Sequence, residues 1–234
     1  MANKTIENQN CLTCKHVGHA FCSLVEDEIS LFNDSKKESL VKKGSVIFSE
    51  NYFPTGIYSI YDGKVKISKL GDEGKEQIVR FAKSGDLIGY RALLSEDAYQ
   101  ASAIALNDVT LCHIPKAKFL EVLKTNSSLY INIMKTLAKD LRNAENRILS
   151  ISQKPVRERI AETLIILYYK FGHKENESID VKLSRKDIGN IAGSTIETTI
   201  RTLSDLKKDK LIAFNGKEII VKDITALMNI ANLH

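Results

Sequence analysis

The chain has 234 residues, of which 43% are hydrophobic and 27% charged, and its formal net charge is +5 at pH 7. This length allows one or two domains with a sizeable core, and the modest positive charge permits nucleic-acid binding without indicating it. The apolar run from Leu164 to Tyr169 is far too short for a membrane span, and residues 1–10 lack the apolar segment of a secretory signal. We therefore expect a globular cytoplasmic protein.

Cysteines dominate the N-terminal segment. Cys11, Cys14 and Cys22 lie close together, whereas the fourth cysteine, Cys112, lies far downstream. In an intracellular chain such clustering indicates metal or redox chemistry rather than structural disulfides. Four thiolates can hold a [4Fe-4S] cluster, and the same cysteines with a neighbouring histidine can hold zinc. A metal-free thiol switch is a third interpretation, and Cys112 alone is also compatible with an ordinary buried thiol.

The segment from Asp27 to Leu40 is predicted to be a short helix, and the following residues are rich in β-forming side chains. Short strands separated by glycine-containing turns predict a β-barrel or β-roll. Gly85 and Gly89 are interpreted as turn residues, because two glycines at this spacing are a weak signal for phosphate binding. The predicted strands are Ser45–Phe48, Ile57–Tyr61, Lys64–Lys69, Glu76–Ala82, Ala101–Ala105 and Thr110–Ile114.

From Lys116 onward the apolar period becomes helical. Apolar residues recur at spacings of three and four, which is typical of a coiled-coil seam. A helix with this seam can pair with a second copy of the chain, but a seam this short can also pack on its own β-domain. The residues predicted to mediate dimerisation are Leu137, Leu141, Ala144, Ile148 and Ile151.

Pro155 marks the start of a C-terminal domain, because proline is favoured at the beginning of a helix. The first helix of this domain is predicted to run from Val156 to Phe171. A second helix, from Arg185 to Ala192, is indicated by Ser184 and Asp187, which have the spacing of a capping box.

Gly193 then supplies a tight turn, and a further helix is predicted from Ser194 or Thr195 to about Lys208. Two helices joined in this way indicate a helix-turn-helix. Leu211–Phe214 and Glu218–Val221 are short apolar runs around Asn215-Gly216, the dipeptide favoured in a type I′ hairpin. The hairpin would form the wing of a winged helix.

Glu197 and Arg201 are one helical turn apart, near the end of the helix that such proteins insert into the major groove. Arg201 can donate to guanine O6 and N7, Glu197 can accept from cytosine N4, and the neighbouring isoleucines can contact thymine methyl groups. An ordinary surface ion pair is the alternative, but the cap, turn and wing around the pair favour base reading. The predicted DNA-binding residues are Ser184, Arg185, Thr195, Ile196, Glu197, Thr198, Ile200 and Arg201.

A β-roll, a long helix and a winged helix-turn-helix, in that order, resemble the CRP/FNR superfamily of bacterial transcription regulators, and the resemblance covers nearly the whole chain. It is greatest for the FNR-type oxygen sensors, through DIGNIAGSTIETTIRTL from Asp187, GDLIGYRALL from Gly85 and ALNDVTLCHIP from Ala105. The resemblance implies an α+β fold whose β-roll is a jelly roll like that of cyclic-nucleotide-binding domains. The expected domains are a cysteine-rich segment (1–26), the β-roll (27–115), a dimerisation helix (116–153) and the winged helix-turn-helix (154–234).

The resemblance also implies a [4Fe-4S] cluster, with Cys112 as the fourth ligand and Cys11, Cys14 and Cys22 as the other three. Seven residues separate Cys14 from Cys22, where FNR has five, which makes Cys22 the least secure ligand and leaves zinc as an alternative. Binding of a cyclic nucleotide is disfavoured. The Arg-Ser pair and the Glu that hold the nucleotide in CRP-like proteins are matched here by Tyr99, Gln100 and Tyr90, and we expect no guanidinium there to neutralise a phosphate.

In the family, an intact cluster favours a homodimer that binds a palindromic promoter site, and oxygen reverses this. Activation through RNA polymerase is likewise implied. Ile200 replaces the small residue that the family has at this base-facing position, so the outer bases of the half-site are not implied. Other signals remain as rivals, namely haem-bound nitric oxide, an organic ligand or thiol redox. An enzyme finds no support, because there is no nucleophile motif and His113, His173 and His234 are isolated histidines.

Overall fold

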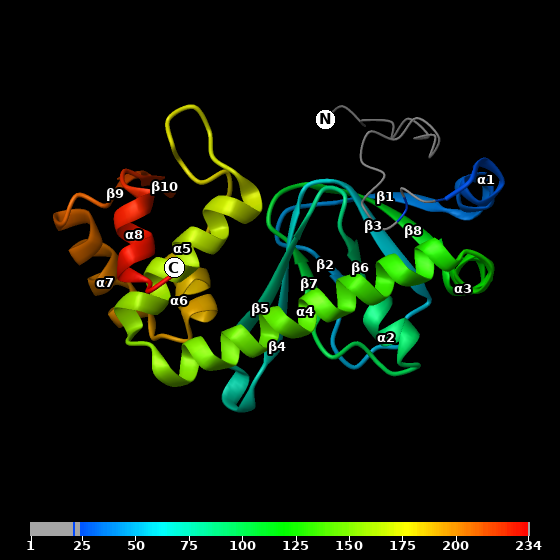
Figure 1. The fold of residues 1–234 in the computed structure, drawn as a ribbon, viewed down its shortest axis with the longest axis horizontal. Coiled ribbons are helices and arrows are strands. Elements are labelled where there is room, and N and C mark those ends of the chain that lie inside the picture. The colour runs from blue at the N-terminus through cyan, green and yellow to red at the C-terminus, as the bar shows by residue number, and fades with distance from the viewer. Residues whose placement is uncertain (1–20, 22–23, 234) are drawn as a thin grey trace. The chain divides into compact units, whose positions relative to one another are not determined.

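The computed structural model describes residue 21 and residues 24–233 (Figure 1). The predicted ligands Cys11, Cys14 and Cys22, and also His234, lie outside the described residues. The described part of the chain divides into two compact units, one formed by residues 21, 24–69 and 80–141 and the other by residues 70–79 and 142–233. Within the described part of the chain, no helix is long and apolar enough to cross a membrane.

The predicted β-roll is formed by two four-stranded sheets with the strand orders β1-β8-β3-β6 and β2-β7-β4-β5, and it belongs to the first unit except for residues 70–79, which include the end of β4 and the start of β5. Both sheets contribute to one apolar cluster, which includes Ile60, Val65, Ala103 and Leu111. Alternate residues of each strand enter this cluster because successive side chains point to opposite faces. The strands are β1 (Lys37–Val41), β2 (Val46–Phe48), β3 (Gly56–Asp62), β4 (Lys64–Leu70), β5 (Glu76–Lys83), β6 (Leu87–Ile88), β7 (Ser102–Ala105) and β8 (Val109–Pro115).

The predicted helix from Asp27 to Leu40 is wrong in its second half. Helix α1 spans Glu26–Ser35, and the residues from Lys37 onward form β1. The backbone becomes extended at Lys36, and every residue of β1 pairs with one of β8. Pairing with a strand that is distant in the sequence therefore overrides the local preference for a helix. The local sequence does not indicate this pairing.

Two further short elements of the first unit, β6 and helix α2 (Tyr90–Leu94), were not predicted from the sequence. Both are too short for a period to be recognised. Gly85 and Gly89 have φ angles of 88° and 86°, so their interpretation as turn residues is confirmed.

The helical region after Lys116 is broken at Asn126 into α3 (Lys116–Thr125) and the long helix α4 (Ser127–Gln153). The side-chain Oδ1 of Asn126 accepts a hydrogen bond from the Leu129 amide at 2.7 Å, which caps α4. Its Nδ2 donates to Glu28 of α1 at 2.6 Å. The start of α4 is thereby tied to α1, and Leu129 and Ile133 are buried in a second apolar cluster with residues of α1, α2 and α3.

The second unit holds the winged helix-turn-helix, and its main elements follow the prediction. Its helices are α5 (Val156–Phe171), α6 (Arg185–Ala192), α7 (Ile196–Lys208) and α8 (Ile224–Ile230), and its strands are β9 (Ile212–Asn215) and β10 (Glu218–Val221). The short helix α8, whose Leu227 is buried, was not indicated by the sequence.

The hairpin is confirmed, but its predicted turn is wrong by one residue. Asn215 pairs with Glu218, so Gly216 and Lys217 form the loop. A type I′ turn needs positive φ at both central residues, and of the two only Gly216, at 58°, is among the described residues with positive φ.

Candidate DNA-binding surface and cysteine site

The predicted capping box at the start of α6 is present. The Ser184 hydroxyl accepts from the Asp187 amide, and the Asp187 carboxylate accepts from the Ser184 amide, both at 3.0 Å. Gly193 ends the helix in the left-handed conformation, with φ of 61°. Thr195 caps α7 by accepting from the Thr198 amide at 3.2 Å, so Ser194 and Thr195 precede this helix.

Helix α7 presents one exposed and one buried face. Thr199, Thr202, Leu203 and Leu206 are buried, whereas the predicted base-reading residues lie on the opposite side. The exposed or half-exposed members of the predicted set are Ser184, Arg185, Thr195, Ile196, Glu197, Thr198, Ile200 and Arg201. The structure therefore leaves these side chains accessible, as a recognition surface requires.

Gly189 allows α6 and α7 to approach closely. A Cβ atom at this position would lie 2.9 Å from both the Ser194 carbonyl oxygen and Thr199 Oγ1. Arg159 of α5 fixes the same turn from the other side, because its guanidinium donates to the carbonyl oxygens of Ala192 at 2.8 Å and Gly193 at 3.1 Å. The helix-turn-helix angle is thus held by backbone contacts that the sequence motif alone did not identify.

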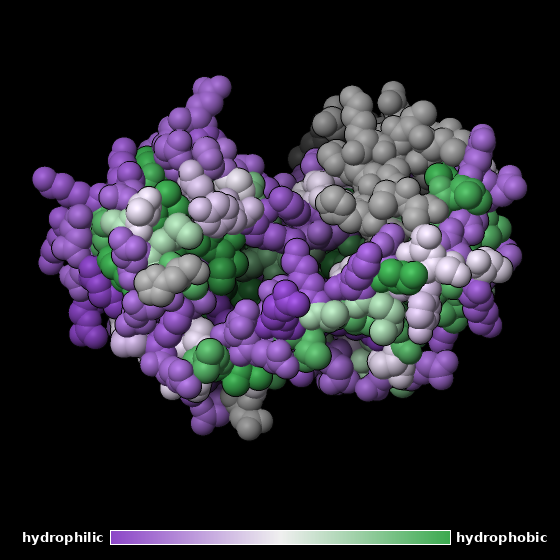
Figure 2. All heavy atoms as spheres, viewed as in Figure 1, coloured by the Kyte–Doolittle hydropathy of each residue, from purple (hydrophilic) through white to green (hydrophobic). Residues whose placement is uncertain are grey.

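The predicted seam lies on α4, and most of it is exposed. Ile148 is 70% exposed and Leu141 61%, whereas Leu137 is half-buried against the cluster that contains Leu129. Ile131 and Met134, each 50% exposed, extend the apolar stripe toward the start of the helix. Figure 2 shows apolar groups at intervals along the course that α4 takes in Figure 1. An exposed stripe of this length is typical of an interaction surface.

Cys112 lies on β8 and is 9% exposed. It shares a face of that strand with Ile114, because residues two apart point the same way. Ile114 belongs to the same apolar cluster as Phe21, whose ring lies 5.4 Å from that of Phe32 in an edge-on arrangement. Phe21 directly precedes Cys22 in the sequence. The chain is therefore anchored, next to one predicted ligand, in the cluster that also covers this face of β8.

A buried ion pair adjoins Cys112. Glu38 of β1 is the register partner of Cys112, so the two side chains share a face of the sheet. Lys36 Nζ lies 2.8 Å from Glu38 Oε1, and the Lys36 side chain is only 2% exposed. The thiol of Cys112 is thus shielded from water, as a structural metal ligand often is, and the charges of Lys36 and Glu38 offset each other. Among the described residues, no group of three or more His, Cys, Asp or Glu side chains could hold a metal ion.

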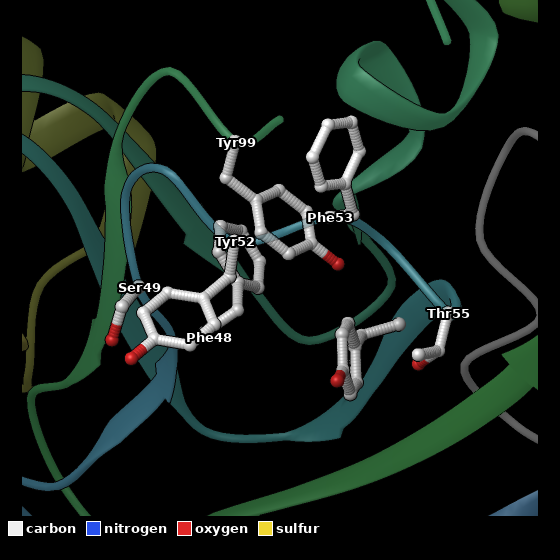
Figure 3. A pocket seen from close by; sticks show the side chains of 7 residues that line it. Phe48, Ser49, Tyr52, Phe53, Thr55 and Tyr99 are labelled. Atoms are coloured by element: carbon white, nitrogen blue, oxygen red, sulfur yellow. The ribbon is translucent and has the colours of Figure 1, made fainter. Parts of the chain in front are cut away.

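Of the three positions that matched nucleotide-binding residues, Tyr90 and Tyr99 hold buried phenols, whereas Gln100 is exposed. Tyr99 stacks on Phe48 with ring centroids 4.0 Å apart, and burial raises the pKa of its phenol. An open depression of about 250 Å³ beside them is lined by side chains that carry no charge (Figure 3). Its lining consists of Phe48, Ser49, Tyr52, Phe53, Thr55, Tyr58 and Tyr99.

None of the three matched positions holds an arginine, but a guanidinium from β5 lies beside Tyr90. Arg80 Nη1 is 3.4 Å from the Tyr90 hydroxyl. Its charge is nevertheless engaged, because Asp140 Oδ2 of α4 lies 2.5 Å from Arg80 and 2.8 Å from Arg91 and accepts from Tyr90 at 2.7 Å. Burial raises the pKa of the Tyr90 phenol, so this group stays a proton donor to Asp140. The residues around Tyr90 thus attach α4 to the β-roll.

The isolated histidines have structural surroundings. His113 Nε2 is 3.2 Å from Thr55 Oγ1, and burial lowers the pKa of this imidazole. His173 stacks on Tyr168 with centroids 4.6 Å apart.

Comparison with known proteins agrees with this architecture. Residues 38–126 match the cyclic nucleotide-binding domain, and residues 158–230 match the Crp-like helix-turn-helix domain. The chain is 30% identical over 210 residues to the transcriptional activator protein Anr of Pseudomonas protegens, covering 88% of this chain and 85% of that protein. It is 28% identical over 212 residues to the fumarate and nitrate reduction regulatory protein of Escherichia coli, covering 89% of this chain and 84% of that one.

Among solved structures, FixK2 from Bradyrhizobium japonicum is similar, with a TM-score of 0.75 and 26% identity over 83% of this chain and 96% of FixK2. These relatives are regulators of transcription rather than enzymes. Together with the β-roll, the long helix and the capped helix-turn-helix, the similarities lead to one conclusion: the chain belongs to the CRP/FNR family of transcription regulators.

Proposed function

We propose that this regulator senses oxygen, or a related redox or nitric oxide signal, through a [4Fe-4S] cluster held by Cys11, Cys14, Cys22 and Cys112. The signal would control homodimerisation along α4 and, through it, binding to a palindromic promoter site in the cytoplasm. Contacts with RNA polymerase would then activate transcription. When bound, the cluster would supply an iron centre that reacts with oxygen.

The observation that carries this proposal is the setting of Cys112. Its thiol is shielded on β8, and Phe21, the residue before Cys22, lies in the apolar cluster of the same face. Phe21 is thus the described residue that precedes a proposed ligand in the sequence, and it packs in the cluster to which Ile114, on the same face of β8 as Cys112, belongs. Two relatives are named the fumarate and nitrate reduction regulatory protein of Yersinia pestis and the anaerobic regulatory protein of Pasteurella multocida, and these names support the proposal.

The chain's own residues offer a route from this site to the dimer seam. Glu28 of α1, a few residues after the cysteine-rich segment, accepts a hydrogen bond from Asn126 Nδ2, and Asn126 caps α4. Leu137 of the seam packs on the cluster that contains Phe21. A change in the anchoring of the N-terminal segment can therefore bias the packing of α4, which is the two-state coupling that such a switch needs.

The surface on α7 supports the DNA-binding half of the proposal. Glu197 and Arg201 are exposed one turn apart, and the caps of α6 and α7 fix the helix that carries them. In a symmetric dimer two such helices can enter successive major grooves of a palindrome. Arg201 would donate to guanine, and Glu197 would accept from cytosine.

Metal analysis under strict exclusion of oxygen tests the sensing half. Iron, acid-labile sulfide and zinc per protomer are measured on the full chain, and visible absorption is followed as air is admitted. Equal iron and sulfide, with colour that bleaches in air, support the proposal. Zinc in place of iron, which the longer Cys14 to Cys22 spacing keeps open, would contradict it. A chain that keeps no metal after attempted reconstitution would point to another signal, such as thiol redox, haem-bound nitric oxide or an organic ligand.

A further inference from the structure

The ring of Phe214, on wing strand β9, faces two cations from different helices. The guanidinium carbon of Arg185, the first residue of α6, lies 4.1 Å from the ring centroid, and Lys207 Nζ, in the last turn of α7, lies 5.9 Å from it. Both distances are within the range of a cation–π interaction. One half-buried ring therefore gathers positive charge from both helices of the helix-turn-helix.

This arrangement favours the binding of an anion. Two cations on one ring repel each other, and among the described residues neither Arg185 nor Lys207 forms an ion pair with a carboxylate. Burial lowers the pKa of the Arg185 guanidinium, which reflects the cost of removing this charge from water. The π face of Phe214 offsets only part of that cost, and a phosphate can supply the rest.

We propose that Phe214 is a positioning residue for DNA binding, and that its ring holds Arg185 and Lys207 ready to receive one backbone phosphate beside the wing. This inference rests on the proposed binding of DNA and adds to it a contact that is independent of sequence. A guanidinium already held on a ring loses less conformational entropy when it binds. Neutralising a phosphate also releases counterions, so the contact contributes to the salt dependence of binding.

The sequence alone did not single out Phe214, because it alternates with buried Ile212 and so has the spacing of a core residue. Its role depends on where α6 begins and α7 ends relative to β9. That proximity arises only in the folded domain.

Two measurements on the full, cluster-loaded chain test the proposal. Both are made under exclusion of oxygen. The first needs no DNA: NMR of the free protein should show the Arg185 side-chain protons shifted upfield by the ring, and this shift should vanish in Phe214→Leu. The second measures affinity over a series of salt concentrations, for a palindromic duplex enriched by the wild-type chain from a random pool and for an unrelated duplex of equal length.

We expect Phe214→Leu to weaken binding to both duplexes by roughly 3-fold to 30-fold, with little change in their ratio. Phe214→Tyr keeps the ring and should restore binding. In an Arg185→Ala background, Phe214→Leu should cost much less than it does alone, because its partner has already been removed. Tyr169→Leu removes an exposed ring from the same unit and serves as the matched control.

Independent, additive losses from Phe214→Leu and Arg185→Ala would overturn the proposal, as would an unshifted Arg185 spectrum. If Phe214→Leu binds DNA with the affinity of the wild type but melts at a lower temperature, the ring has only a structural role. A wild-type chain that enriches no duplex from the random pool would overturn the proposed function and this inference together, whereas the other outcomes bear on this inference alone.

Discussion

Arg201 is the residue with the most specific predicted role, which is to recognise a guanine base. Its side chain is exposed on α7, where it can donate two parallel hydrogen bonds to guanine. Arg201→Ala should therefore cost about 1–3 kcal/mol of specific binding and relax the preference at one G·C pair. Affinity for a panel of single-base variants of the enriched duplex measures this. Lys210→Ala, which removes an exposed cation beyond α7, is the control, and an unchanged preference in Arg201→Ala would refute base reading.

Cys112 is the described member of the predicted ligand set. Cys112→Ala should remove nearly all iron and sulfide, because a [4Fe-4S] cluster has no spare thiolate here. The small loss of buried volume should leave the fold intact. Thr110→Ala, a half-buried change on the same face of β8, provides the control. Full iron content in Cys112→Ala would show that another side chain completes the site.

Single residues were predicted well where the physics is local. The capping box at Ser184 and the left-handed glycine at 193 depend on contacts within a few residues, and both are present. The role of Arg80 was missed because its partner, Asp140, lies 60 residues away and no local pattern joins them. The wing turn was misplaced because Asn-Gly favours the turn centre, whereas the strand register set by Asn215 and Glu218 moved it by one residue.

At the scale of elements, the crossing of α6 and α7 depends on Gly189. Alanine is usually the better helix former by about 1 kcal/mol, but here its Cβ would lie 2.9 Å from a backbone oxygen. We expect Gly189→Ala to destabilise the helix-turn-helix by about 1–3 kcal/mol. Thermal unfolding followed by circular dichroism checks this. Gly71→Ala, where the nearest atom is 3.6 Å away, should change little. Equal melting temperatures of all three proteins would contradict the packing argument.

Attachment of α4 to the β-roll depends on Asp140. Asp140→Asn removes the charge that pairs with Arg80 and Arg91, two guanidiniums that are only partly exposed. Since the site is not fully buried, we expect a loss of about 1–2 kcal/mol of unfolding free energy. Chemical denaturation measures it. Asp108→Asn breaks an exposed ion pair with Lys42 and should have a smaller effect. A larger loss in Asp108→Asn than in Asp140→Asn would contradict the role of Asp140 in attaching α4.

Elements with a long period or a clear cap were predicted, and short or non-local ones were not. The bounds of α5 agree with the sequence, because Pro155 and Gly172 frame a fully helical pattern. In contrast, β1 was mistaken for helix because only its pairing with β8 makes it a strand. The break at Asn126 was missed because apolar periodicity continues on both sides of it.

At the scale of the whole molecule, metal binding and dimerisation should be separable. Ile148→Glu places a charge on the exposed part of the seam, far along α4 from the residues that pack with Phe21. Its iron content should therefore stay normal, whereas the dimer dissociation constant should rise by roughly 30-fold or more. Sedimentation without oxygen, with metal analysis of the same sample, measures both. Ile166→Glu, an exposed isoleucine on α5, is the control. A dimer that stays intact in Ile148→Glu would contradict the prediction that the seam on α4 is the dimer interface.

The length of α4 has a mechanical consequence. The helix has 27 residues, so it is a rod about 40 Å long at 1.5 Å per residue. Hinged at its capped start, a rod of this length turns a tilt of about 5° into a displacement of about 3.5 Å at its far end. A displacement smaller than an atomic diameter near Asn126 would thus be several-fold larger at Gln153. Long helices act as levers, and the distance over which this one amplifies movement is comparable to one turn of DNA, about 34 Å.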